Sequence, residues 1–344
     1  MALLIQYTLI FASVLMLVAL GGCFSEHSGI VNIGLEGIMV IGALGGALMM
    51  RYLPDGTPAP MMIVMDCLAA VLAGAVYSLL LAVAAVHFNA DQTIIGTAMN
   101  MLGTAMATVI VKALNMMVNP DDVSSTIEYV VQKKAFYFNI PFPTIEKIEK
   151  TVLDLENLEV ESVVESYQFA MGTLELSWFM VIAVALLIIS HIVLYRTRFG
   201  LRLCACGEHP QAAASVGINV YKMRYAGVII SGILGGLGGI VYITSGVSEW
   251  KFENAVAGFG FLALAVMIFG QWKPVNIALA ALLFGLMRAL SNVYVAFDFL
   301  ANLPIPGTVY NMLPYIISLV VLIFTSKKSR APKAEGIPYD KGSR

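Results

Sequence analysis

Hydrophobic positions along the chain form long runs instead of the alternation that marks a half-buried strand. Most of these runs reach the roughly 20 residues that a helix needs to cross the hydrocarbon core of a bilayer. They predict about nine membrane-spanning or re-entrant segments, at residues 3–23, 31–52, 60–86, 93–115, 174–195, 225–247, 255–270, 274–297 and 308–326. The run at 255–270 is short and contains glycine, so we expect a re-entrant segment or a broken helix there.

The composition supports the same class. Of the 344 residues, 59% are hydrophobic and 12% are charged, and the mean hydropathy is +0.84. Soluble domains carry roughly 25% charged residues, so most of this surface is not expected to face water. We predict an all-α, polytopic membrane domain over residues 1–326 and a tail at 327–344. The net charge of −2 gives no reason to expect a nucleic-acid partner.

A signal peptide is the alternative interpretation of the first 23 residues, because Leu20-Gly21-Gly22-Cys23 approaches a lipoprotein cleavage site. However, no lysine or arginine precedes Arg51, so the positive region that opens a signal peptide is missing. Further hydrophobic spans follow at once. We therefore expect the first run to remain in the protein as a membrane span.

The sequence offers little catalytic chemistry. It contains no G-x-x-x-x-G-K-[ST] loop, and its four histidines are scattered, with no Ser/His/Asp arrangement or metal-ligand cluster. The cysteines show neither a disulfide framework nor zinc-site spacing. We expect free thiols at Cys23, Cys67, Cys204 and Cys206. These observations argue against an enzyme and against a metal site.

Basic residues predict the orientation in the membrane. The loop at 196–224 carries five basic residues against one acid, Glu208, and the tail at 327–344 carries six more. Lys273 lies in a third short loop on the same side. The loop and tail residues are Arg196, Arg198, Arg202, Lys222, Arg224, Lys327, Lys328, Arg330, Lys333, Lys341 and Arg344. We expect both segments, and hence the C-terminus, to be cytoplasmic.

The same orientation places the long loop at 116–172 outside the cell. This insertion contains ten acids and four lysines, a net charge of −6. Its residues 144–167 have apolar positions at helical spacing and predict a surface amphipathic helix. One interpretation is a cap over the outer mouth of the protein. The other is a docking surface for an external partner.

Asn32, Gly34, Glu36 and Gly37 open the second span. Glycine and asparagine weaken a helix start, and non-helical backbone at membrane depth survives only where protein buries it or where it lines a cavity. A carboxylate that faces lipid is costly. One interpretation is therefore a broken helix in a translocation path. The other is that Glu36 caps a helix N-terminus just outside the membrane core.

A comparable interruption, Gly258-Phe259-Gly260-Phe261, lies in the second half of the chain. Two glycine-interrupted hydrophobic segments, one in each half, indicate a transport site between structural repeats. These four residues are therefore further candidates for the translocation path.

Arg288 is also a candidate, because it lies near the middle of the span at 274–297 and must find a carboxylate, carbonyl groups or water there. Glu36 is a candidate partner. The segment 231–239 places small residues at i, i+3, i+4 and i+7, which predicts close approach of another helix.

A short helix is predicted inside the loop at 196–224. Pro210 suits the first turn of a helix, residues 211–216 follow, and Gly217 suits the C-terminal cap. A short exposed helix rich in small residues fits a groove on another protein. The alternative is an ordinary connecting helix.

The loop at 200–220 reads G-L-R-L-C-A-C-G-E-H-P-Q-A-A-A-S-V-G-I-N-V. This pattern resembles the coupling region of ABC-importer permeases of the branched-chain amino acid and simple-sugar superfamily. The stretch F-S-E-H-S-G-I-V-N-I-G-L-E-G at 24–37 is similar to permease subunits of nucleoside importers that work with basic-membrane-lipoprotein-type receptors. Gly258-Phe-Gly-Phe and Gly285-Leu-Met-Arg288 agree with the same family, and the resemblance covers most of residues 20–326.

The resemblance implies a type II ABC-importer-like permease in a bacterial-type cell (inner) membrane. It implies a cytoplasmic ATPase that uses ATP, a second homologous permease subunit in a heterodimer, and an external substrate-binding lipoprotein. The chain itself would bind no cofactor and would be surrounded by membrane lipids. The residues that would couple it to the ATPase are Gly207, Glu208, Pro210, Ala212, Ala213 and Gly217.

Nucleosides are the expected cargo, and Phe259, Phe261 and Trp250 are candidates to stack on a base, although packing is the commoner role of such rings. Simple sugars, riboflavin and branched-chain amino acids are alternative cargoes within the superfamily. An ion-coupled secondary transporter is the alternative of another class. It usually needs buried acids, for which only Glu36 and Asp66 qualify.

Overall fold

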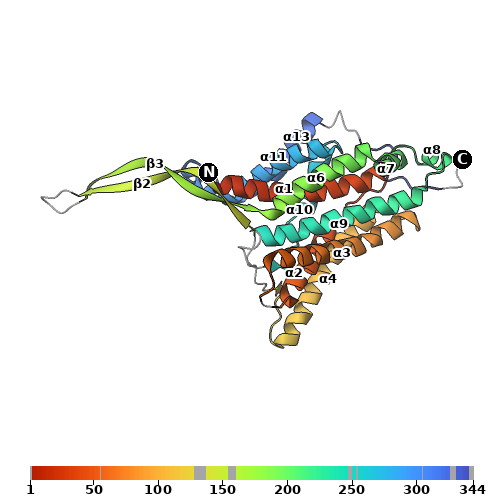
Figure 1. Cartoon of the computed structure of the whole chain (residues 1–344), viewed down its shortest axis with the longest axis horizontal. Coiled ribbons are helices and arrows are strands. Elements are labelled where there is room, and N and C mark those ends of the chain that lie inside the picture. Colours follow the sequence, from red (N-terminus) through yellow and green to blue (C-terminus); the bar gives the residue numbers. More distant parts are fainter. Residues whose placement is uncertain are drawn as a thin grey trace.

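The computed structural model describes residues 2–54, 56–127, 137–153, 160–246, 250–252, 255–303, 305–325 and 331–340. Every apolar run predicted from the sequence is a helix (Figure 1). These helices are α1 (Ala2–His27), α2 (Leu35–Tyr52), α3 (Ala59–Val86), α4 (Gln92–Val118), α6 (Trp178–Arg196), α9 (Val220–Gly246), α10 (Phe259–Phe269), α11 (Pro274–Val293) and α13 (Gly307–Thr325).

Seven helices in the described part of the chain are long and apolar enough to cross a membrane, whereas α10 and α13 are shorter apolar helices. The helical, polytopic class is therefore confirmed, and α10 is short, as the run at 255–270 predicted. Short helices and strands connect the bundle: α7 (Arg198–Glu208), α8 (Pro210–Ser215), a 3₁₀ turn η2 (Tyr294–Ala296), α12 (Asp298–Ala301), β1 (Thr126–Ile127) and β4 (Trp250–Lys251).

Helix α1 lies in the centre of the bundle, where it packs against α9, α10 and α11 (Figure 1). Its residues from Ile10 to Glu26 are all buried, as expected for a helix that is apolar on every side. This helix belongs to the core, in agreement with the expectation that the first run is a span.

The small residues of α9 allow α2 and α3 to approach it closely, as predicted. A Cβ atom added at Gly236 would lie 2.4 Å from the carbonyl oxygen of Ala70 in α3. A Cβ atom added at Gly42 of α2 would lie 2.3 Å from the Cα atom of Gly236. Any side chain at these positions would collide with backbone, so glycine determines how near the three helices lie.

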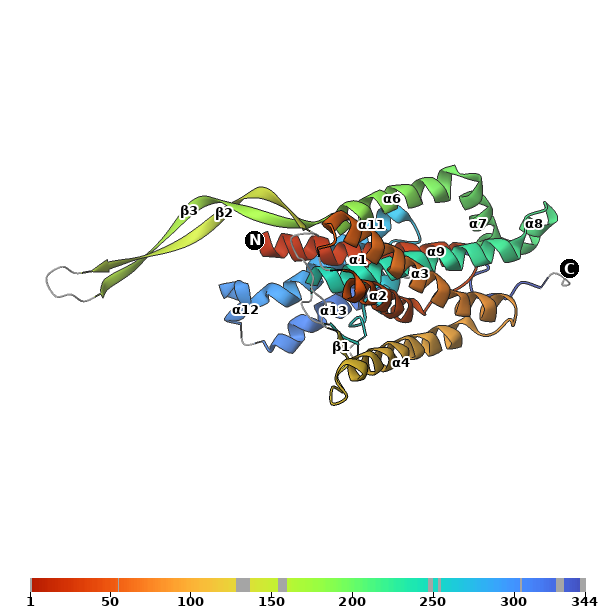
Figure 2. The same ribbon diagram turned by 60° about the horizontal axis from the view of Figure 1, so that its bottom comes forward.

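The predicted amphipathic helix at 144–167 is wrong. Two long antiparallel strands occupy the insertion, β2 (Tyr137–Leu153) and β3 (Val160–Ser177), with Tyr137 paired to Ser177. The hairpin projects away from the helices (Figures 1 and 2). Apolar spacing within one strand did not reveal this fold, because the ladder depends on a partner strand further along the chain.

The two ends of the bundle carry different segments. Helices α7 and α8 lie at the same end as the chain's C-terminus, and the hairpin extends from the other end (Figures 1 and 2). The basic loop at 196–224 and the described part of the tail, residues 331–340, therefore lie together, whereas most basic residues of the tail fall outside the described residues. The acidic insertion lies opposite them.

Candidate functional site

The first candidate site lies where α2 begins beside the short helix α10. Gly258, the N-cap residue of α10, has φ +78°, a conformation that favours glycine. A Cβ atom at Gly260 would lie 2.4 Å from the backbone nitrogen of Glu36, so only glycine permits this approach. The two glycine-interrupted segments predicted from the sequence thus meet in space.

Glu36 caps α10 from the first turn of α2. Its side chain is 4% exposed, and its carboxylate accepts hydrogen bonds from the N–H groups of Gly258 at 2.9 Å and Gly260 at 2.7 Å. The first N–H groups of a helix lack partners within the helix and favour a negative charge. The capping interpretation is therefore correct in kind. The capped helix, however, is distant in sequence, and the contact is buried in the bundle.

Replacing Gly260 by alanine is expected to destabilise the protein by about 1–3 kcal/mol, because the new methyl group must displace the backbone of α2. Gly34→Ala is the matched control, since its Cβ atom would meet no neighbour closer than 3.4 Å. The midpoint of thermal unfolding of the purified chain in detergent should fall for Gly260→Ala and stay near the wild-type value for Gly34→Ala. Equal midpoints for the two variants would contradict the close approach.

Phe259 centres a cluster of aromatic rings beside this cap. Its ring is 1% exposed and lies 5.5 Å from the ring of Phe11 and 4.7 Å from that of Tyr242. The guanidinium carbon of Arg288 lies 5.5 Å from the Phe259 ring centre, a cation–π distance. The suggested ion pair between Arg288 and Glu36 is not formed among the described residues, because Glu36 binds the α10 N-terminus instead.

The rings that were candidates for stacking on a base differ in access. Phe259 is enclosed in its cluster, whereas Phe261, two residues further along α10, is 48% exposed. The side chain of Trp250 lies outside the described set, and its backbone pairs with Ile127 in a two-stranded ladder. In this conformation Phe261 is therefore the accessible member of the predicted group.

The remaining path candidates hold α2 against its neighbours. Asn32 is buried and donates a hydrogen bond from Nδ2 to the Ser231 hydroxyl at 2.8 Å, which joins the start of α2 to α9. Gly37 donates its N–H to Oδ1 of Asn100 at 2.8 Å. Gly34 is buried in the same turn. In this conformation these hydrogen bonds join α2 to α9 and α4 in the buried interior of the bundle.

Sequence reasoning missed Asn100 of α4. Its amide nitrogen also donates to the carbonyl oxygen of Ile33 at 3.0 Å, so one side chain serves two backbone groups of the broken segment. The available signal was a buried asparagine within the apolar run at 93–115. Such a polar side chain in a membrane helix is expected to find a partner on a neighbouring helix.

The second candidate site is α8, the short helix at the end of the bundle opposite the hairpin (Figure 1). Pro210 occupies its first turn, as predicted. Gly217 has φ +84°, its N–H binds the Ala214 carbonyl, and the N–H of Ile218 binds the Ala213 carbonyl. This arrangement is a Schellman cap, which confirms the predicted stop at Gly217.

The two faces of α8 differ. Ala213 is buried, while Ala212 and Val216 on the outer side are exposed, Val216 by 75%. Glu208 and Gly217 are also exposed. Gly207 is buried, and a Cβ atom there would lie 2.3 Å from the carbonyl oxygen of His27, so this glycine packs α7 on the end of α1. Of the candidate coupling residues, Gly207 and Ala213 are therefore packed against the rest of the protein. Glu208, Ala212 and Gly217 are exposed and accessible to a partner.

Comparison with known proteins finds relatives along the whole chain. The guanosine ABC transporter permease protein NupQ of Bacillus subtilis is 38% identical, over 100% of this chain and 98% of its own length. The nucleoside ABC transporter permease protein NupC of Lactococcus lactis is 36% identical, over 97% of this chain and 95% of its own length.

A further relative matches a smaller part of this chain. The nucleoside ABC transporter permease protein NupB of Lactococcus lactis is 31% identical, over 32% of this chain and 30% of its own length. No solved structure matches the chain. The family model described as branched-chain amino acid transport system / permease component matches residues 4–326, and the chain belongs to this family.

Proposed function

We propose that this chain is the membrane-spanning permease subunit of an ATP-driven ABC importer for nucleosides. The observation that carries the proposal is the similarity, along the full length, to permeases of guanosine and nucleoside transporters. The buried contact between α2 and α10, where Glu36 accepts from the N–H groups of Gly258 and Gly260, joins the two halves of the chain and is the element that would open and close. The chain would hold no cofactor and would carry out no catalysis of its own.

The ends of the bundle support an assignment of sides. The end with α7 and α8 carries the basic loop at 196–224 and would face the cytoplasm, where the ATPase docks. The hairpin would then face outward. Because it projects from the bundle (Figures 1 and 2), it suits contact with an external substrate-binding lipoprotein better than it suits a cap over the mouth.

A second permease subunit would complete the pore. Lactococcus lactis supplies two of the relatives, each named as a nucleoside transporter permease, which supports a pair of similar subunits. Helices α3 and α4 expose large apolar side chains, including Leu72, Val76 and Met101, that lipid or such a subunit would cover.

The outer face of α8 offers a direct test of ATPase docking. Val216→Asp is expected to reduce co-purification of the ATPase by about tenfold or more, because a charge would enter an apolar contact, a loss of ~1.4 kcal/mol or more. Val123→Asp makes the same change at a residue 67% exposed, located after α4 near β1. That control should co-purify the ATPase normally. Docking would be refuted by a Val216→Asp chain that still binds the ATPase fully.

Cargo is tested by uptake into proteoliposomes that contain the whole complex with ATP inside. Labelled guanosine should accumulate, and excess unlabelled nucleosides should compete with it. Accumulation of a simple sugar, riboflavin or a branched-chain amino acid without nucleoside competition would favour the alternative cargoes. Uptake that follows an ion gradient and ignores ATP would favour a secondary transporter.

A further inference from the structure

Residues 331–340 are hydrogen-bonded to the helical bundle. We call this segment the C-terminal strap. The N–H group of Ala334 donates to the carbonyl oxygen of Gly207 at the end of α7, at 2.8 Å, and the N–H group of Gly336 donates to that of Gly29 at 3.2 Å. Arg224 of α9 is 1% exposed and donates from Nη2 to the carbonyl oxygen of Ile337 at 2.9 Å.

A carboxyl pair adds a second attachment to α1. The carboxyl group of Glu335 interacts with that of Glu26, which is 3% exposed. Glu26 also accepts a hydrogen bond from the indole nitrogen of Trp272. Burial raises the pKa of Glu335, whereas the contact with the Glu26 carboxyl lowers it.

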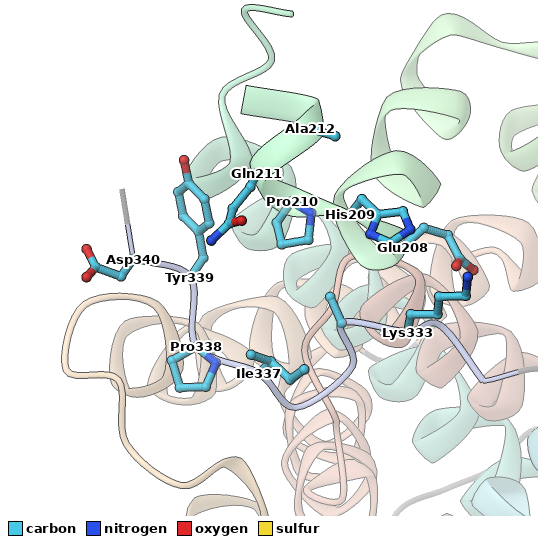
Figure 3. A pocket seen from close by; sticks show the side chains of 11 residues that line it. Glu208, His209, Pro210, Gln211, Ala212, Lys333, Ile337, Pro338, Tyr339 and Asp340 are labelled. Atoms are coloured by element: carbon cyan, nitrogen blue, oxygen red, sulfur yellow. The ribbon is translucent and has the colours of Figure 1, made fainter. Parts of the chain in front are cut away.

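The strap ends against the inner face of α8. Tyr339 is buried in one apolar cluster with Cys206 of α7, Ala213 of α8 and Val220 of α9. Its ring lies edge-on to that of Tyr221, with the ring centres 5.3 Å apart. Between α8 and the strap lies a cleft of about 400 Å³, which Figure 3 shows with Tyr339 on the same side as Gln211.

Without the strap, α8 would have few anchors. Among the helices and strands of the described chain, α8 makes its main contacts with α7 and α9, its immediate neighbours in sequence. It is six residues long, too short to be stable on its own. The strap adds a noncovalent link from α8 to elements that are distant along the chain, including the end of α1.

We propose that the C-terminal strap is a positioning element for α8, which clamps its inner face to the cytoplasmic ends of α1 and α9. A push or pull of the ATPase on α8 would then move these two central spans and would not merely bend a loop. This inference rests on the proposed function, which supplies the ATPase that would drive the movement. The clamp itself is a property of this chain and can be measured separately.

The first measurement uses the native thiol of Cys206, which is fully buried under the strap. The full complex is exposed to a maleimide, and the labelled cysteines are identified by peptide mass spectrometry. Tyr339→Ala should increase the rate of Cys206 labelling by about tenfold or more, which corresponds to ~1.4 kcal/mol of lost protection. The control is Ile337→Ala, because that side chain is 54% exposed and its carbonyl bond to Arg224 remains.

The second measurement is the number of substrate molecules imported per ATP hydrolysed by the reconstituted complex. Tyr339→Ala should lower this ratio by about tenfold while the ATPase stays bound and active, whereas Ile337→Ala should not change it. Removal of residues 331–344 should give the same result as Tyr339→Ala. If the strap had only a structural role, Tyr339→Ala would lower the amount of folded complex and leave the number of substrate molecules imported per ATP unchanged.

The outcomes separate the two ideas. If Cys206 stays protected in both Tyr339→Ala and the truncated chain, the clamp does not exist. If Cys206 becomes reactive and the ratio does not change, the strap clamps α8 without transmitting motion, and the proposal is overturned. If the wild-type complex fails to import with ATP, the proposed function fails, and the labelling alone decides whether the strap holds α8.

Discussion

Replacing Glu36 by alanine should lower the stability of the chain by about 2–6 kcal/mol, because two buried N–H groups would each lose their acceptor at about 1–3 kcal/mol. These donors are the N–H groups of Gly258 and Gly260 at the start of α10. The contact is buried, with Glu36 4% exposed, so these N–H groups have no bulk water beside them. The midpoint of thermal unfolding in detergent measures this loss.

Glu36→Gln is the matched control. Its amide has one acceptor oxygen, so one of the two N–H groups keeps a bond while the other faces the NH₂ group. We expect a midpoint between those of the wild type and Glu36→Ala, and the same order in ATP-driven uptake. If Glu36→Ala is as stable as the wild type, the carboxylate does not hold α10.

Gly236→Ala should also be strongly destabilising, by about 1–3 kcal/mol and at the upper end of that range, because the clash involves backbone that cannot rotate away. The added Cβ atom would lie 2.4 Å from the carbonyl oxygen of Ala70, so α3 must move away from α9. Such a shift would also disturb Gly42 of α2, which packs on the same residue.

The neighbouring glycine provides the control. At Gly235 the nearest atom to an added Cβ is Cγ2 of Ile38, at 2.9 Å, and the three nearest atoms all belong to side chains instead of backbone. Folded yield and the thermal midpoint should therefore fall much less for Gly235→Ala than for Gly236→Ala. The reverse order would show that the crossing of α3 and α9 is not limited by backbone contact.

The membrane helices could be predicted from the sequence because their signal is local. An apolar run of sufficient length must become a helix in lipid, where every backbone N–H and C=O group needs a partner within the segment. The end of α8 was equally predictable, since Gly217 adopts the left-handed conformation that a helix stop favours. Such features depend on a few adjacent residues.

Features that depend on distant partners were missed or left open. Glu36 was expected to cap a helix or line a path, but only the fold shows that it caps α10. The strap is attached in part through backbone groups, such as the N–H groups of Ala334 and Gly336, and these leave no pattern in the sequence. The basic residues of 327–344 indicated a side of the membrane but not a role.

We propose that this chain is a gate moved by a separate ATPase subunit. The most direct test compares labelled nucleoside uptake, with ATP present, by proteoliposomes that hold the purified chain alone and by those that hold it with the second permease, the ATPase and the receptor. We predict accumulation against a gradient in the complete system and none with the chain alone. Uphill transport by the isolated chain on addition of ATP would show that it is not a passive gate.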